Sequence, residues 1–134
     1  MSSDEIRVPG WPAPRGYANG RTGHGRVVHV AGQIGWDDNG QLVSTDLAPQ
    51  FVRALENVIA VVRAAGGVPA DIATMTVFVT DLAAYRSGVK PIGAAWRGLF
   101  GRHYPAMTLV AVSALVEPGA LVEVQATAYV GAAP

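Results

Sequence analysis

LVEVQATAYV, which runs from Leu121 to Val130, decides the fold because its residues alternate between two characters. Every second residue from Val122 to Val130 is valine or alanine, and polar residues from Glu123 to Tyr129 stand between them. Successive side chains of a strand point to opposite faces, so the valines and alanines predict a face packed against helices. The other face is polar with little charge, which indicates an interface between subunits and a partly buried pocket around Glu123.

Two helical regions precede this strand. Apolar residues recur at helical spacing over residues 51–62, with Asp46 placed to cap the start of the helix and Gly66 placed to end it. In the second region, proline is compatible only with the first turn of a helix. The chain is therefore expected to break near Val89 and to begin a new helix at Pro91.

The remaining elements are predicted to be strands. Residues 26–36 are rich in β-branched side chains and are broken by Gly32 and Gly35, which predicts a strand with a bulge or bend. An Asn-Gly pair in residues 37–41 then predicts a hairpin turn. Further strands are expected over residues 72–80 and 106–114. The order β-β-α-β-α-β-β predicts an α+β fold with helices on one face of a sheet.

Composition limits the possible partners. The 134 residues, half of them apolar, suffice for a single domain over residues 1–134. Ten basic and ten acidic side chains give no general attraction for nucleic acid, and the absence of cysteine excludes disulfides and thiolate metal sites. The start, MSSDEIRVPGW, has no secretory signal, so a cytoplasmic protein without a membrane partner is expected. The Gly- and Pro-rich first 25 residues predict an extended arm.

Short motifs along the chain resemble one known family in their order and spacing. They are Gly16-Tyr17, AGQIG at 31–35, Gln50 and Asn57 of QFVRALENV, Ala65-Gly66, VFVTD at 77–81, PAMTLV at 105–110 and LVEVQATA at 121–128. The chain resembles the YjgF/Rid family, also labelled L-PSP endoribonuclease-like, over nearly its whole length. The resemblance implies a chorismate-mutase-like fold in a homotrimer, with the sheets lining a central barrel. It also implies small-molecule pockets between subunits and no cofactor.

Five positions relate to the pocket that the resemblance implies. Family members of the deaminase type hydrolyse enamines and imines such as 2-aminoacrylate, and hold the substrate carboxylate with the arginine of a PAR[ST] motif. Met107 stands at that position, and its thioether has neither the charge nor the forked donors of arginine. Glu123 matches a glutamate that positions or activates water, and Tyr17 matches a tyrosine that reaches a neighbouring subunit's pocket. Ala31 replaces a frequent serine and Leu109 an occasional cysteine.

These residues also have purely structural interpretations. Met107 can be core packing, Glu123 a solvated surface residue, and Tyr17 the anchor of a loop. A displaced cation could replace the missing arginine, the candidates being Arg15, Arg21, Arg26, Lys90 and Arg102. The three histidines, His24, His29 and His103, lack the close spacing of a metal site, and no metal is expected.

Two functional hypotheses follow. The first is a small-molecule hydrolase or deaminase-like enzyme that acts on an enamine, imine or related substrate in a pocket between subunits. The exchange of arginine for Met107 argues against a standard 2-imino-acid deaminase. The alternative is a non-catalytic trimer that binds a small ligand or regulates. Ribonuclease activity ranks below both because the net charge is zero and no aromatic and basic stripe is present.

Overall fold

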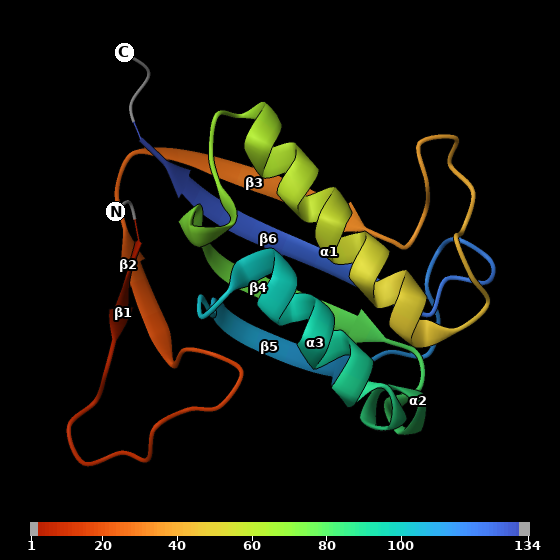
Figure 1. Ribbon diagram of the computed structural model, residues 1–134, viewed down its shortest axis with the longest axis horizontal. Helices are drawn as coiled ribbons and strands as arrows, with labels where there is room; N and C mark the ends of the chain where they lie inside the picture. The colour runs from red at the N-terminus through yellow and green to blue at the C-terminus, as the bar shows by residue number, and fades with distance from the viewer. Residues whose placement is uncertain (1–2, 132–134) are drawn as a thin grey trace.

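A four-stranded sheet in the order β3-β6-β4-β5 is the centre of the computed structural model, which describes residues 3–131 (Figure 1). Strand β4 pairs antiparallel with β6 and parallel with β5, and β3 pairs antiparallel with β6. Because β4 lies between them, β5 and β6 are not neighbours although they are consecutive in the chain. The strands are β3 (Arg26–Gln33), β4 (Ile72–Val79), β5 (Ala106–Ala111) and β6 (Val122–Val130).

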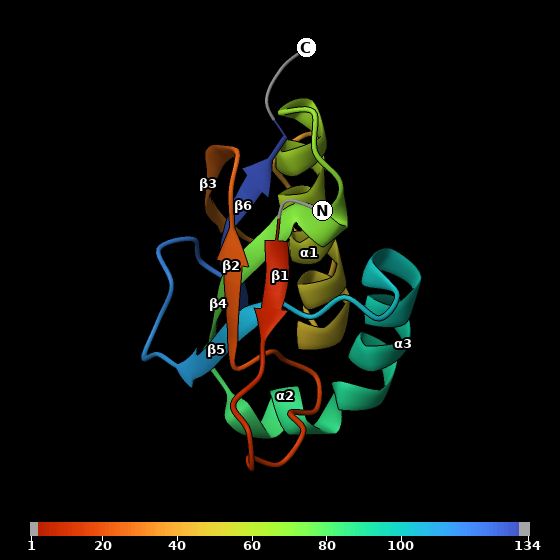
Figure 2. The same ribbon diagram turned by 90° about the vertical axis from the view of Figure 1, so that its left-hand side faces the viewer.

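Helices cover one face of this sheet and leave the other face open (Figure 2). They are α1 (Leu47–Ala64), α2 (Leu82–Ser87) and α3 (Val89–Phe100), with a short 3-10 turn at Pro69–Asp71. The prediction of an α+β fold with helices on one face is confirmed. The predicted break falls at Gly88, and α3 begins at Val89, so that Pro91 stands in its first turn.

Burial along β6 follows the alternation in its sequence. Val122, Val124, Ala126, Ala128 and Val130 are all buried, whereas the residues between them are partly or fully exposed. The pairing extends both faces across the sheet: Val124 pairs with the buried Val77 of β4, and Glu123 pairs with the half-buried Phe78. Helix α1 covers the buried face with residues at helical spacing, from Leu47 to Val62.

A buried glutamine fixes the start of α1 to the loop before β6. The side-chain amide of Gln50 is fully buried and donates to the carbonyls of Ser44, at 2.9 Å, and Gly119, at 3.0 Å. Its oxygen accepts from the backbone N–H of Leu121 at 2.8 Å. All of its hydrogen-bonding groups are therefore used, and the end of β6 that carries Glu123 is held against α1.

The segment after β3 forms the predicted hairpin turn, but with a single antiparallel bridge and no second strand. Asp37 accepts from the backbone N–H groups of Asn39 and Gln41, which closes a tight turn and lowers the pKa of Asp37. Beyond that turn a single bridge joins Trp36 to Leu42. Backbone hydrogen bonds from Asp37 to the carbonyl of Gln41, at 2.7 Å, and from Val43 to that of Gly35, at 2.9 Å, flank this bridge. The amide of Asn57 on α1 donates to the carbonyls of Ile34 and Trp36, both at 3.0 Å, and so holds the segment against the helix.

A hairpin of two strands forms in the first 25 residues, where an extended arm was predicted. Strands β1 (Ser3–Ile6) and β2 (Gly20–Gly23) pair antiparallel and lie at one end of the main sheet, on the left in Figure 1. Arg21 attaches this hairpin to the chain before β5, since it donates to the hydroxyl of Ser3 at 2.8 Å and to the carbonyl of Tyr104 at 3.1 Å. The chain therefore has three strands before α1 rather than two.

Candidate functional site

Met107 and Leu109 line an apolar cavity on the helix side of β5. They are half-buried and pair in parallel register with Met75 and Val77 of β4, whose side chains belong to the core. Strand alternation therefore places residues 107 and 109 under the helices, and Thr108 and Val110 on the open face. The cavity has a volume of about 250 Å³ and is lined by Gly16, Phe51, Tyr85, Val89, Ile92, Gly93, Trp96, Arg97, Tyr104, Met107 and Leu109.

Two stacked aromatic pairs form walls of this cavity. The rings of Phe51 and Tyr85 stack with their centroids 6.0 Å apart, and those of Trp96 and Tyr104 stack at 5.8 Å with planes only 3° apart. The indole N–H of Trp96 is already used, because it donates to the carbonyl of His103 at 3.1 Å. The cavity consequently offers apolar ring faces, the thioether of Met107 and few hydrogen-bonding groups.

Glu123 and Ala31 lie on the other side of the sheet. Glu123 follows the buried Val122 and precedes the buried Val124, so its side chain points to the open face. An ideal Cβ on Gly32 would lie 2.7 Å from the carboxyl carbon of Glu123, which means that the carboxyl group rests on the Gly32 backbone. Ala31, which directly precedes Gly32 in β3, is exposed.

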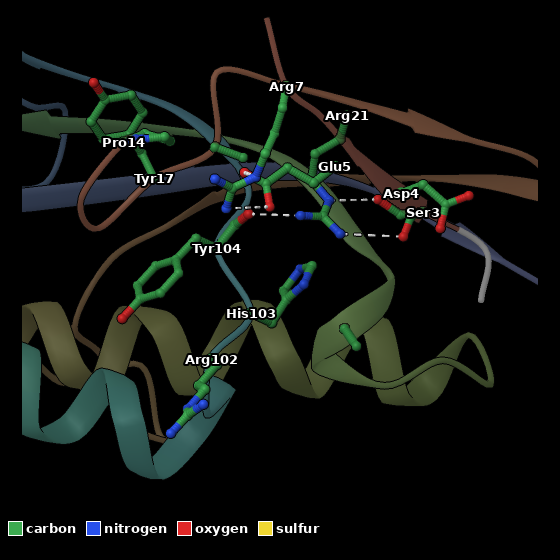
Figure 3. Close-up of a pocket in the computed structure, with 12 residues that line it drawn as sticks. Ser3, Asp4, Glu5, Arg7, Pro14, Tyr17, Arg21, Arg102, His103 and Tyr104 are labelled. Carbon is green, nitrogen blue, oxygen red and sulfur yellow. Dashed lines mark hydrogen bonds and ion pairs between the residues drawn. The ribbon is translucent and has the colours of Figure 1, made fainter. Parts of the chain in front are cut away.

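Tyr17 lies in the segment that joins β1 to β2 and borders a different cavity. Its neighbour Ala18 is buried and donates its N–H to the carbonyl of Pro105 at 2.9 Å, which places this segment beside the start of β5. Gly16 reaches the Met107 cavity, whereas the Tyr17 side chain is 43% exposed and borders a cleft of about 560 Å³ under the β1–β2 hairpin. Figure 3 shows the Tyr17 ring pointing away from Arg21 and His103 in this cleft.

The five basic residues proposed as displaced cations do not line the Met107 cavity. Arg21 is held by Ser3 and Tyr104 in the cleft under the hairpin, and Arg102 borders the same cleft (Figure 3). Arg26 donates to the carbonyl of Ala65 at 2.9 Å. Arg15 and Lys90 are exposed.

A basic residue that the sequence did not single out lines the cavity instead. Arg97 stands in the last turn of α3, and one guanidinium nitrogen lies 3.7 Å from the position that a Cβ on Gly93 would occupy. The spacing of four residues between Gly93 and Arg97 puts them on one face of the helix. That spacing is the only sequence signal that could have indicated how this side chain lies.

One copy of the chain therefore divides the predicted site residues among three places. Met107 and Leu109 share the apolar cavity, Ala31 and Glu123 share the open face of the sheet, and Tyr17 borders the cleft under the hairpin. Met107 and Glu123 are separated by β4 and face opposite sides of the sheet. A pocket that contains both residues requires a second copy of the chain.

Residues 3–131 contain no group of three or more His, Asp or Glu side chains that is placed to hold a metal ion. In the same residues, none of the helices is both long enough and apolar enough to cross a membrane.

Comparisons with known proteins place the chain in a family. The family model described as Endoribonuclease L-PSP matches residues 11–130. A RutC family protein of Pyrococcus abyssi is 31% identical over 130 residues, which cover 96% of this chain and 98% of the relative. The human 2-iminobutanoate/2-iminopropanoate deaminase is 30% identical over 107 residues, 79% of this chain and 74% of that enzyme.

A solved structure agrees with these relatives. The crystal structure of YyfB from Yersinia pestis, described as a Rid-family protein of unknown function, superposes with a TM-score of 0.83 at 32% identity. The superposition covers 97% of this chain and all of the other. The family model, the Pyrococcus relative and the Yersinia structure agree, and the chain therefore belongs to the YjgF/Rid family.

Proposed function

We propose that this protein hydrolyses the C=N bond of a small imine, or of the enamine in equilibrium with it, in a pocket between two copies of the chain. The observation that carries the proposal is the placement of Glu123 on the open face of the sheet and of the Met107 cavity on the opposite face. In a homotrimer, the open faces meet around a central axis and the edge at β5 of one copy approaches Glu123 of the next. The human relative named as a 2-iminobutanoate/2-iminopropanoate deaminase supports this class of reaction.

The chemistry requires one acid-base group and an ordered water. Water adds to the carbon of the C=N bond, and the resulting carbinolamine breaks its C–N bond to release ammonia and leave a carbonyl group. Glu123 accepts a proton from the attacking water and passes it to the imine nitrogen, which gives the carbinolamine. It then accepts the hydroxyl proton of the carbinolamine and delivers it to the same nitrogen as the C–N bond breaks. The Gly32 backbone beneath the carboxyl group limits where that group can lie, which favours a fixed position for the water.

Met107 separates this protein from a deaminase that anchors a carboxylate at residue 107. Charge-assisted hydrogen bonds contribute about 1.5–3 kcal/mol each, so the loss of a bidentate pair weakens binding at that point by about two orders of magnitude or more. The proposed substrate therefore has an apolar or neutral group against Met107. A standard 2-imino acid such as 2-iminopropanoate is expected to be a poor substrate.

The test compares ammonia release from freshly generated 2-aminoacrylate and from a neutral enamine. Wild type, Met107→Arg and Glu123→Gln are measured side by side. We expect wild type to act on the neutral enamine, Met107→Arg to gain activity on 2-aminoacrylate, and Glu123→Gln to lose at least about a hundredfold in rate on both. Unchanged turnover in Glu123→Gln would refute the mechanism.

The position of the carboxyl group can be tested without removing it. Gly32→Ala places a Cβ where the Glu123 side chain now lies, so the carboxyl group must move while its charge remains. We expect a reduced kcat and a nearly unchanged melting temperature, since the end of a glutamate side chain can shift at little cost. Equal kcat values for Gly32→Ala and wild type would show that the placement of Glu123 does not matter for the reaction.

A second candidate function is favoured by Met107 itself. A pocket that has lost its anchoring charge could bind a ligand without turning it over. Saturable binding of a small molecule, no ammonia release from any variant and no effect of Glu123→Gln on affinity would support a non-catalytic binding protein.

A further inference from the structure

We infer that Arg97 binds the anionic end of the ligand in the Met107 cavity, so that the ligand is an apolar carboxylate that lies with its carboxylate toward α3. The inference rests on the proposed function in one respect only, namely that this cavity is the ligand pocket. It assigns to a helix residue the charge that the family's motif places on the strand at residue 107.

The charges around the cavity support this assignment. Arg97 is the only ionised side chain that lines it, within the part of the chain that the structure describes, and no carboxylate stands among its neighbours there. In residues 3–131 the guanidinium of Arg97 forms no hydrogen bond or ion pair, unlike that of Arg21 or Arg53. A guanidinium beside apolar walls is available for a planar anion, which it can bind through two parallel hydrogen bonds.

Glycine at residue 93 leaves room for that charge beside the helix. Gly93 has no side chain, and the Arg97 guanidinium occupies the nearby space, with one nitrogen 3.7 Å from the position of a Cβ. The charge therefore lies along the α3 wall of the cavity. Met107 and Leu109 on β5 line another part of the same cavity and receive the apolar part of the ligand.

The cavity limits the size of the ligand's apolar part and favours an aromatic ring. A closed apolar cavity of roughly 150 Å³ holds one benzene molecule, so about 250 Å³ has room for a ring with a short chain. The half-buried rings of Tyr85 and Tyr104, which stack on the buried Phe51 and Trp96, line the cavity and give it aromatic walls for such a group. A carboxylate joined to an aromatic ring through two or three carbons fits both the charge and the walls.

The experiment measures binding by titration calorimetry on the full-length protein in its native oligomeric state. The probes are 3-phenylpropanoate and its neutral counterpart 3-phenylpropanamide, which differ in charge and hardly in shape. Wild type should bind the carboxylate at least about tenfold more tightly than the amide, and Arg97→Gln should remove most of this preference. The matched control is Arg63→Gln, because Arg63 is an exposed arginine in the last turn of α1, as Arg97 is in α3.

A second variant leaves Arg97 in place. Gly93→Glu introduces a carboxylate four residues before Arg97, into space where only the guanidinium is near. The pair that forms on the helix competes with the ligand, so this variant should also lose the preference for 3-phenylpropanoate. Because glutamate favours a helix more than glycine does, a loss of folding does not explain such a result.

Several outcomes would overturn the inference. They are equal binding of the two probes by wild type, no binding of either probe at about 10 mM, a preference retained by Arg97→Gln, and an equal loss in Arg63→Gln. Because calorimetry detects binding without turnover, these outcomes are independent of ammonia release. Unchanged turnover in Glu123→Gln or a silent ammonia assay would count against the proposed function and leave this result standing.

Discussion

His103 is held in its neutral form beneath the N-terminal hairpin. Its Nε2 donates to the carbonyl of Ile72 at 2.7 Å, since a carbonyl can only accept. Burial lowers the pKa of His103 below its ordinary value of 6.5, and the charge of Arg21 acts in the same direction. The hydrogen bond to Ile72 and the charge of Asp71 oppose this shift without cancelling it.

The shift predicts a pH dependence of stability. Below the ordinary pKa the unfolded chain takes up a proton at His103 that the folded protein does not, so the free energy of unfolding falls as the pH decreases. Urea unfolding between about pH 7.5 and pH 5 should show a steeper loss for wild type than for His103→Gln, which cannot titrate. If His103→Gln folds at pH 7.5 and loses stability toward pH 5 as steeply as wild type does, His103 is not the cause of the pH dependence.

Gln50 is expected to contribute more to stability than other amides of α1. Gln50→Leu leaves the N–H of Leu121 and the carbonyls of Ser44 and Gly119 without the fully buried amide that pairs with them, which should cost about 2–4 kcal/mol in the free energy of unfolding. Asn57→Leu is the matched control. It also removes two hydrogen bonds to carbonyls, those of Ile34 and Trp36, but the Asn57 side chain is only half-buried, so water can replace its amide more easily than that of the fully buried Gln50. Equal costs in urea unfolding would show that burial of the Gln50 network is not decisive.

At the scale of elements, Arg21 holds β1 to β2 and, together with the backbone bond from Ala18 to Pro105, joins the β1–β2 hairpin to the chain before β5. Arg21→Gln removes the contacts with Ser3 and with the Tyr104 carbonyl, so the hairpin should open more often while the main sheet keeps its stability. Hydrogen exchange should then show faster exchange within residues 3–23 and little change in β4. Arg26→Gln is the control, since Arg26 bonds only to Ala65 at the end of α1. Unchanged exchange in the hairpin would mean that other contacts hold it.

Elements with a clear period could be predicted from the sequence, and those held by distant contacts could not. Strands β4 and β6 and helix α1 agree with their predicted ranges within a few residues, because one face of each is buried in the core. Strands β1 and β2, with the sequences SDEI and GRTG, have no alternation to read. Their order depends on Arg21, whose partner Tyr104 is 83 residues away in the chain.

The candidate site was predictable in its residue types and not in its geometry. The alternation of β6 assigns Glu123 to the polar face, but the face of β5 that carries Met107 depends on which strand lies beside it. That strand is β4, and the parallel register with Met75 puts Met107 under the helices. Arg97 was missed because its position on α3 resembles that of an ordinary solvated residue, and only the folded chain brings α3 over β5.

At the scale of the whole molecule, the open face of the sheet predicts self-association. Val110 of β5 is 39% exposed there and pairs with the half-buried Phe78 of β4, so apolar side chains on these two strands would face water in a monomer. The proposed function also requires a second copy, because Met107 and Glu123 cannot meet within one chain. We therefore expect a homotrimer with a mass three times the 13.9 kDa of the chain.

Light scattering after size exclusion, at about 10 μM protein, measures this mass for wild type and two variants. Thr76→Arg places a long cation at the centre of the open face, where Thr76 pairs with Thr108 on one side and Gln125 on the other. It should yield monomers, because three unpaired guanidinium groups would be brought together at the shared axis. Val61→Arg, on the exposed side of α1, introduces the same side chain away from this face and should leave the trimer intact. A monomeric wild type would exclude the shared pocket, and with it the proposed role of Glu123 opposite Met107.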